Sequence, residues 1–199
     1  MHYRPLFESQ HLRLASLDLE KDAPVIASWT NELDVAAHLR EDQPARPMAP
    51  FEVKKLYERW QKESDDTQRQ YLFAIHLLEQ AAEAGQDPII GVLRIKWIEY
   101  VHGASYLDLI LANPQDWEDY ANEALDLALR YAFDELNLFR VTAVVPGHDQ
   151  RASRLFEQAN FTLEVRQREA IYWNQRSWDK LFFGILRPEW KLRQPEVTE

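Results

Sequence analysis

Alternating apolar and polar residues, or short apolar runs, mark seven segments of this chain as strands. These predicted strands cover residues 11–17, 71–78, 89–100, 105–111, 140–145, 161–173 and 177–186. The run over 71–78 is almost continuously apolar, which predicts a central strand buried on both faces. His102-Gly103 and Asn174-Gln175 separate neighbouring strands, and each predicts the turn of a hairpin.

Apolar residues at helical spacing mark four further segments. The predicted helices cover residues 22–39, 51–62, 116–137 and 152–159. Asp18 or Asp22 is suited to cap the first of them. Asn113, Pro114 and Asp116 predict an N-cap, a first helical residue and a first-turn acid for the longest. The segment from Glu189 onward is predicted to be a charged tail.

The order of these elements and the composition both indicate one globular domain. Helices alternate with strands, which predicts an α/β layout with a mixed sheet in a single domain over residues 1–199. Hydrophobic residues make up 46% of the chain and charged residues 28%, as in ordinary globular proteins. No apolar run approaches the roughly 20 residues that cross a bilayer, and no secretory signal begins the chain, so we expect a cytoplasmic protein.

Charge and cysteine content narrow the chemistry. The formal net charge of −10 repels nucleic acid and anionic membranes, so we expect neither as a partner. The same charge favours a cationic substrate such as an amine, although it also serves solubility. The chain has no cysteine, which excludes disulfides, a thiolate nucleophile and zinc–thiolate sites. No spacing of histidines predicts a metal site.

An ordered set of short motifs stands between residues 91 and 190. The motifs are Glu123-Ala124-Leu125, Arg130-Tyr131-Ala132-Phe133, Glu135-Leu136, Arg140-Val141, Asp149-Gln150-Arg151-Ala152-Ser153, Asn160-Phe161, Glu164, Arg168-Glu169, Trp178-Asp179 and Arg187-Pro188-Glu189-Trp190. In this order they resemble the GNAT acetyltransferase superfamily, within it the branch of ribosomal-protein N-terminal acetyltransferases (the RimJ/RimL type). The resemblance implies the GNAT fold, a mixed α/β (α+β) sheet of about seven strands flanked by about four helices.

The resemblance also implies acetyl-CoA as the cofactor. Its pantetheine arm would lie along Leu109, Ile110 and Leu111, which would otherwise form an ordinary core strand. The remaining implied contacts are Trp117, Tyr120, Ala121, Asn122, Gln150, Ser153 and Phe156. Where the family has a glycine-rich loop for the diphosphate, this chain has Glu118 and Asp119 and neither glycine. The alternative interpretation is that the protein's own carboxylates fill this anion site.

Proton transfer has three candidate residues. Phe156 stands where the family often has a tyrosine acid, so Ser153, the proposed donor of the ribosomal-protein branch, is the implied acid; Ser153 is equally suited to helix capping. Asp108 or Glu169 is the candidate general base. Isolated carboxylates are more often simply solvated.

Two functions follow from these patterns. The first is an acetyl-CoA-dependent N-acetyltransferase whose acceptor, a small amine or a protein N-terminus, attacks the thioester directly. The second is an inactive binding or assembly module that has lost acetyl-CoA; a different acyl donor is a third. We favour the enzyme, because backbone-mediated binding survives side-chain changes. Trp97 and Trp173 indicate either a partner surface, such as that of a homodimer, or core positions.

Overall fold

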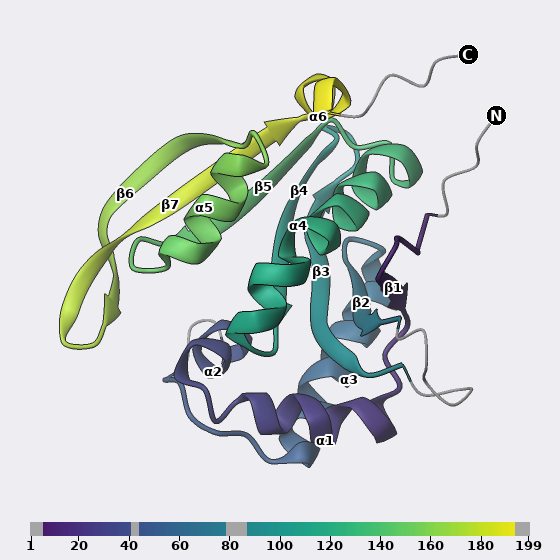
Figure 1. Cartoon of the computed structure of the whole chain (residues 1–199), viewed down its shortest axis with the longest axis vertical. Helices are drawn as coiled ribbons and strands as arrows, with labels where there is room; N and C mark the ends of the chain where they lie inside the picture. Colours follow the sequence, from purple (N-terminus) through teal and green to yellow (C-terminus); the bar gives the residue numbers. More distant parts are fainter. Residues whose placement is uncertain (1–5, 41–43, 79–86, 194–199) are drawn as a thin grey trace. The chain divides into compact units, whose positions relative to one another are not determined.

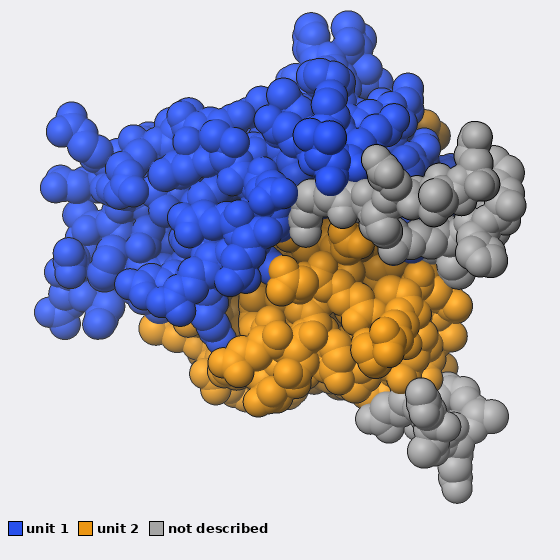
Figure 2. All heavy atoms as spheres, turned by 45° about the horizontal axis from the view of Figure 1, so that its top comes forward, with its two compact units in different colours: residues 1–6, 95–108, 128–199 blue, residues 7–94, 109–127 orange. Residues whose placement is uncertain are grey.

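The structure, a computed structural model, describes residues 6–40, 44–78 and 87–193 (Figure 1). Contacts divide the chain into two compact units (Figure 2). Unit 1 comprises residues 1–6, 95–108 and 128–199, and unit 2 comprises residues 7–94 and 109–127. The prediction of one domain stays a prediction. Residues 41–43 of the first interhelical segment and residues 194–199 of the predicted tail lie outside the described part.

Seven strands form a mixed sheet in the order β1-β2-β3-β4-β5-β7-β6. They are β1 (Leu12–Ala15), β2 (Tyr71–Leu77), β3 (Ile89–Glu99), β4 (Ala104–Leu111), β5 (Arg140–Pro146), β6 (Thr162–Trp173) and β7 (Arg176–Leu186). β4 and β5 run parallel, whereas β1·β2, β5·β7 and β6·β7 are antiparallel. This mixed sheet confirms the predicted fold class.

The described residues of unit 2 contain four helical segments. They are α1 (Leu19–Trp29), α2 (Leu33–Arg40), α3 (Pro50–Thr67) and the first part of α4 (Pro114–Arg130). Of these, α1, α2 and α3 share one apolar core with the strands of this unit. Ile26, Val53 and Tyr57 are fully buried and belong to one cluster that also contains Ile110 of β4. Burial of such side chains is the main favourable term in folding.

The single helix predicted over 22–39 is wrong, because the chain breaks between α1 and α2. Asp18 caps α1 by accepting the N–H of Glu20, and Asp22 in turn accepts the N–H of Asp18. At the other end, the buried Thr30 hydroxyl donates to the carbonyl of Ala27 and accepts the N–H of Met48. This contact to a distant segment ends α1.

The strand buried on both faces is β3 and not β2, contrary to the prediction for 71–78. In β2 only Ala74 and Ile75 are buried. In β3 every residue from 90 to 96 is buried, including Arg94 and Lys96. The arginine stacks on Trp60 of α3, with its guanidinium carbon 4.0 Å from the ring centroid.

Unit 1 contains the long hairpin of β6 and β7, which Figure 1 shows beside α5 (Gln150–Gln158). Its turn residues Asn174 and Gln175 have φ values of 49° and 59°, as the type I′ hairpin turn requires. β6 is exposed along nearly all of its length, except that Ile171 and Trp173 are half-buried. The predicted hairpin is confirmed.

Two helical features of unit 1 differ from the prediction. The longest helix ends as an α-helix at Arg130 and continues as a π-helical segment (Tyr131–Glu135). The segment after Leu186 is a short helix, α6 (Arg187–Arg193), and not a tail. Its Trp190 is buried, and the ring centroids of Trp190 and Phe133 lie 5.2 Å apart. This apolar contact stabilises the helix in an otherwise charged segment. Within the described ranges, no helix has the length and apolar content that crossing a membrane requires.

Candidate active site

The predicted pantetheine strand is the second half of β4. Its parallel ladder with β5 pairs Ala104–Leu107 with Arg140–Ala143, and Leu109, Ile110 and Leu111 follow after that ladder. The three side chains are buried. On the β3 side, the N–H of Ala112 donates to the carbonyl of Ile90 at 2.8 Å. The strand is therefore held by its side chains and by β3, and its cofactor role stays a prediction.

Gly91 of β3 lets β4 approach closely at this point. A Cβ placed on Gly91 would lie 2.4 Å from the carbonyl oxygen of Ile110 and 2.6 Å from a methyl of Leu111. Real Cβ atoms do not approach backbone oxygens so closely. Only glycine therefore permits the present spacing of the two strands.

The start of α4 is closed by its own N-cap. The Oδ1 atom of Asn113 accepts the N–H of Asp116 at 2.9 Å, and the carbonyl of Asn113 accepts the N–H of Trp117 at 3.3 Å. Pro114, the first helical residue, has no N–H to offer. The N-cap, proline and first-turn acid read from the sequence are thus confirmed.

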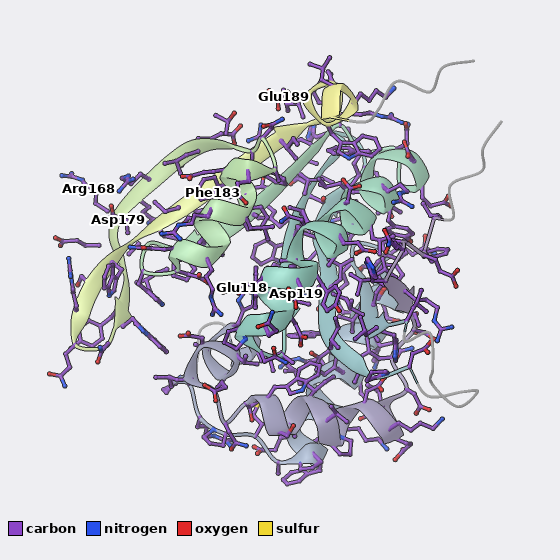
Figure 3. All side chains as sticks on the ribbon, viewed as in Figure 1. Glu118, Asp119, Arg168, Asp179, Phe183 and Glu189 are labelled. Carbon is purple, nitrogen blue, oxygen red and sulfur yellow. The ribbon has the colours of Figure 1, made fainter. Side chains whose placement is uncertain are left out.

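The carboxylates of the first turns lie on the helix itself and are bound by neighbouring amides. Asn113 Nδ2 donates to Asp116 at 2.7 Å, and Gln115 Nε2 donates to Asp119 at 2.7 Å. Partial burial, and after it the nearby charge of Asp119, raises the pKa of Asp116. Glu118 is exposed, and Figure 3 shows it with Asp119 on the first turns of α4. Asn113 therefore caps the N-terminus of α4 with the acids beside it, and the interpretation that carboxylates fill an anion site stays a prediction.

Four of the residues implied as acetyl-CoA contacts lie inside α4. Ala121 is buried, Trp117 and Tyr120 are half-buried, and Asn122 is exposed. Helical backbone bonds engage their amides, as the bond of Trp117 shows directly. Only the side chains of these residues are therefore available to bind a ligand. Cofactor binding by these four residues stays a prediction.

The candidate base Asp108 forms an ion pair inside unit 1. Its carboxylate lies 2.6 Å from Nζ of Lys96, and the two side chains are only 14% and 10% exposed. Lys96 Nζ also lies 4.5 Å from the ring centroid of Trp97. Sequence reasoning did not find this lysine. Lys96 and Asp108 lie at similar sequence distances on either side of the His102-Gly103 turn. The predicted hairpin could therefore have indicated that they face each other across the two strands.

On α5, Ser153 and Phe156 have structural contacts. Asp149 caps the helix by accepting the N–H of Ala152, and the Ser153 hydroxyl donates to the carbonyl of Asp149 at 3.0 Å. Phe156 is buried, 5.0 Å from the ring of Phe161. Gln150 is exposed at the first position of the helix. The capping interpretation of this segment is borne out, and roles in catalysis or cofactor binding stay predictions.

The other candidate base, Glu169, lies at an irregularity of β6. It has a φ of 51° and an exposed side chain. Its backbone N–H and the guanidinium of Arg166 both donate to Asp179, each at 3.1 Å, and together hold the pKa of Asp179 below its usual range. Asp179 lies on β7, the neighbouring strand of this hairpin (Figure 3). The structure thus gives the backbone of Glu169 a role in shaping the hairpin.

The two tryptophans singled out in the sequence differ in exposure. Trp97 is 56% exposed, whereas Trp173 is half-buried and stacks on His148 at 5.2 Å. Among the residues that the structure describes, no group of three or more His, Cys, Asp or Glu side chains could hold a metal ion. A homodimer stays a prediction.

Comparison with known proteins gives a family match over most of the chain. The model of the acetyltransferase (GNAT) domain matches residues 11–162. The spermidine N(1)-acetyltransferase of Vibrio cholerae is 27% identical over 108 residues, which are 54% of this chain and 62% of that enzyme. An uncharacterized N-acetyltransferase of Bacillus subtilis is 30% identical over 71 residues, 36% of this chain and 42% of its own. This chain thus spans less than two thirds of either relative.

Solved structures agree in fold over nearly the whole chain. Spermidine N-acetyltransferase from Vibrio cholerae in complex with CoA and spermine has a TM-score of 0.74 at 22% identity, covering 92% of this chain and 99% of its own. A dodecameric structure of the Vibrio enzyme has a TM-score of 0.70 at 21% identity, covering 94% of this chain and all of its own. At such identities the likeness concerns the fold.

Proposed function

Since the chain belongs to the acetyltransferase (GNAT) domain family, we propose that it is an N-acetyltransferase that moves an acetyl group from acetyl-CoA to a primary amine. The observation that carries this proposal is the family match over residues 11–162. When bound, acetyl-CoA supplies the acetyl group as a thioester. Leu109, Ile110 and Leu111 are the residues proposed to hold its pantetheine arm, since they follow the β4·β5 ladder.

We propose a small polyamine-like cation as the acceptor, in preference to a protein N-terminus. The relative from Vibrio cholerae is named for spermidine, and a structural neighbour contains spermine. The net charge of −10 favours the approach of such a cation. Membership of the ribosomal-protein branch and a cytoplasmic location stay predictions.

Asp108 is the proposed general base. An amine attacks a thioester only as the neutral base, so a carboxylate within reach or a water molecule has to accept its proton. The ammonium of Lys96, at 2.6 Å, orients this carboxylate. Ser153 and Glu169 are the secondary candidates for proton transfer. Direct attack suits a chain without cysteine.

A second candidate function is a binding or assembly module of the same fold. It is favoured by the start of α4, where the side chain of Asn113 accepts the N–H of Asp116. Three acidic residues follow Asn113, namely Asp116, Glu118 and Asp119. A protein of this kind would bind neither CoA nor a donor thioester.

One assay separates the two functions. The purified chain is mixed with millimolar acetyl-CoA and spermidine, and released CoA is followed with a thiol-specific dye. The absence of cysteine in the chain removes the protein's own signal. We expect thiol release that depends on both substrates and that Asp108→Asn lowers about 100-fold or more. The matched control Asp134→Asn, at an exposed carboxylate, should keep wild-type rates.

The binding module would be favoured by two results together. Acetyl-CoA would release no thiol with either spermidine or a peptide N-terminus, and adding CoA would not shift the melting temperature. Preference for the peptide over spermidine would refute the polyamine assignment alone.

A further inference from the structure

A helix N-terminus binds phosphate through backbone amides that have no other partner. In α4 the first residue, Pro114, has no such amide. The amides of Asp116 and Trp117 both donate to Asn113, one to its side chain and one to its carbonyl. Of the first four helical positions, only Gln115 keeps an amide outside these interactions.

The local charge also opposes a phosphate. Asp116, Glu118 and Asp119 stand in the first two turns, where the helix dipole alone would attract anions. Burial and, after it, the charge of the neighbouring Asp119 raise the pKa of Asp116, and a phosphate would add a further negative charge beside these carboxyl groups. The chain's own carboxylates thus already place negative charge at the start of α4.

The backbone leaves little length for a loop. β4 ends at Leu111 and α4 begins at Pro114, so Ala112 and Asn113 alone connect them. Neither residue is a glycine, and Asn113 is committed to the cap. A cradle of successive amides needs several residues in turn conformations, usually with glycine. The residues present therefore do not fit a diphosphate at this position.

We propose that this chain recognises its acyl donor through the pantetheine arm without gripping the diphosphate, and that Asn113 is the residue that closes the phosphate site. The substrate class is then acyl-pantetheine thioesters in general, with CoA as one member. This inference rests on the proposed function, because it concerns the donor of that reaction.

The first test compares acetyl-pantetheine with acetyl-4′-phosphopantetheine, which differ only by the phosphate that α4 would hold. Dissociation constants of the corresponding thiols are measured by calorimetry, and kcat/KM is measured with each thioester and spermidine. A phosphate held by two charge-assisted hydrogen bonds would favour the phosphorylated donor by about tenfold or more. We expect a ratio below about threefold in both measurements; a larger ratio would overturn the inference.

The second test reopens the site with the triple variant Asn113→Gly, Glu118→Gln and Asp119→Asn. Glycine is tolerated at an N-cap and frees the amide of Asp116. We expect phosphopantetheine to bind about tenfold more tightly to this variant, with pantetheine unchanged. The matched control is Asp134→Asn with Glu135→Gln, which removes two exposed acids beyond the other end of α4.

The control should leave both affinities unchanged, and a melting curve checks that each variant folds. Equal gains in the triple variant and the control would reduce the effect to net charge and overturn the role of Asn113. Failure of every donor to bind or react at millimolar concentration would refute the proposed function. Turnover with a strong preference for phosphorylated donors would refute the present inference alone.

Discussion

The ion pair between Lys96 and Asp108 in unit 1 should make a measurable contribution to the free energy of unfolding. At 2.6 Å, the Coulomb attraction of two unit charges is about 6 kcal/mol at an effective dielectric constant of 20. Removing these nearly buried groups from water offsets most of that attraction. Breaking the pair by removing one partner is nevertheless expensive, because it leaves the other charge with little solvent.

We therefore expect Lys96→Met to lower the free energy of unfolding by about 3 kcal/mol. Asp108→Asn should lower it by about 2 kcal/mol, because the ammonium keeps its contact with the ring of Trp97. The double variant should lose about 3 kcal/mol and not the sum, which gives a coupling energy of about 2 kcal/mol.

Urea unfolding followed by tryptophan fluorescence measures all four proteins. The control is the pair of Arg13 and Asp87, which has the same 2.6 Å separation but side chains 41% and 19% exposed. Its coupling should stay below about 1 kcal/mol, since water screens it. Additive effects at Lys96 and Asp108, to within about 0.5 kcal/mol, would refute the assignment of a strong buried pair.

Two further predictions concern unit 2. Gly91→Ala should lower the free energy of unfolding by about 2 kcal/mol, because its Cβ would collide with the carbonyl of Ile110; an unchanged melting temperature would contradict this. Burial raises the pKa of Asp22, so the folded state holds its proton to higher pH than the unfolded state, and stability falls as pH rises from the ordinary value of 3.8 to the raised one. In Asp22→Asn this decline should be smaller, as urea titrations at several pH values would show; an identical decline would refute it.

Caps and turns were predictable because they depend on residues a few positions apart. Asn113 and Pro114 start α4 as expected, and Asp18 caps α1. Gly103 turns the first hairpin with a φ of 63°. In each case a side-chain oxygen or a permissive backbone acts on its own neighbourhood, so no knowledge of the rest of the fold was needed.

Burial and helix breaks were less predictable because they depend on distant partners. The end of α1 is set by Thr30 through Met48, and α6 forms where Trp190 packs on Phe133. The apolar run of β2 is only partly covered. Hydrophobicity along a strand says which residues tolerate burial, but neighbouring elements decide which are buried.

The sequence alone determined the order of the seven strands, the ends with local caps and the family to which the chain belongs, since each of these is encoded by residue types at fixed spacing. The tertiary structure decided the chemistry of individual candidates: Asp108 pairs with Lys96, and the backbone N–H of Glu169 donates to Asp179. These outcomes depend on which groups folding brings within about 3 Å of one another, the range over which hydrogen bonds and ion pairs act.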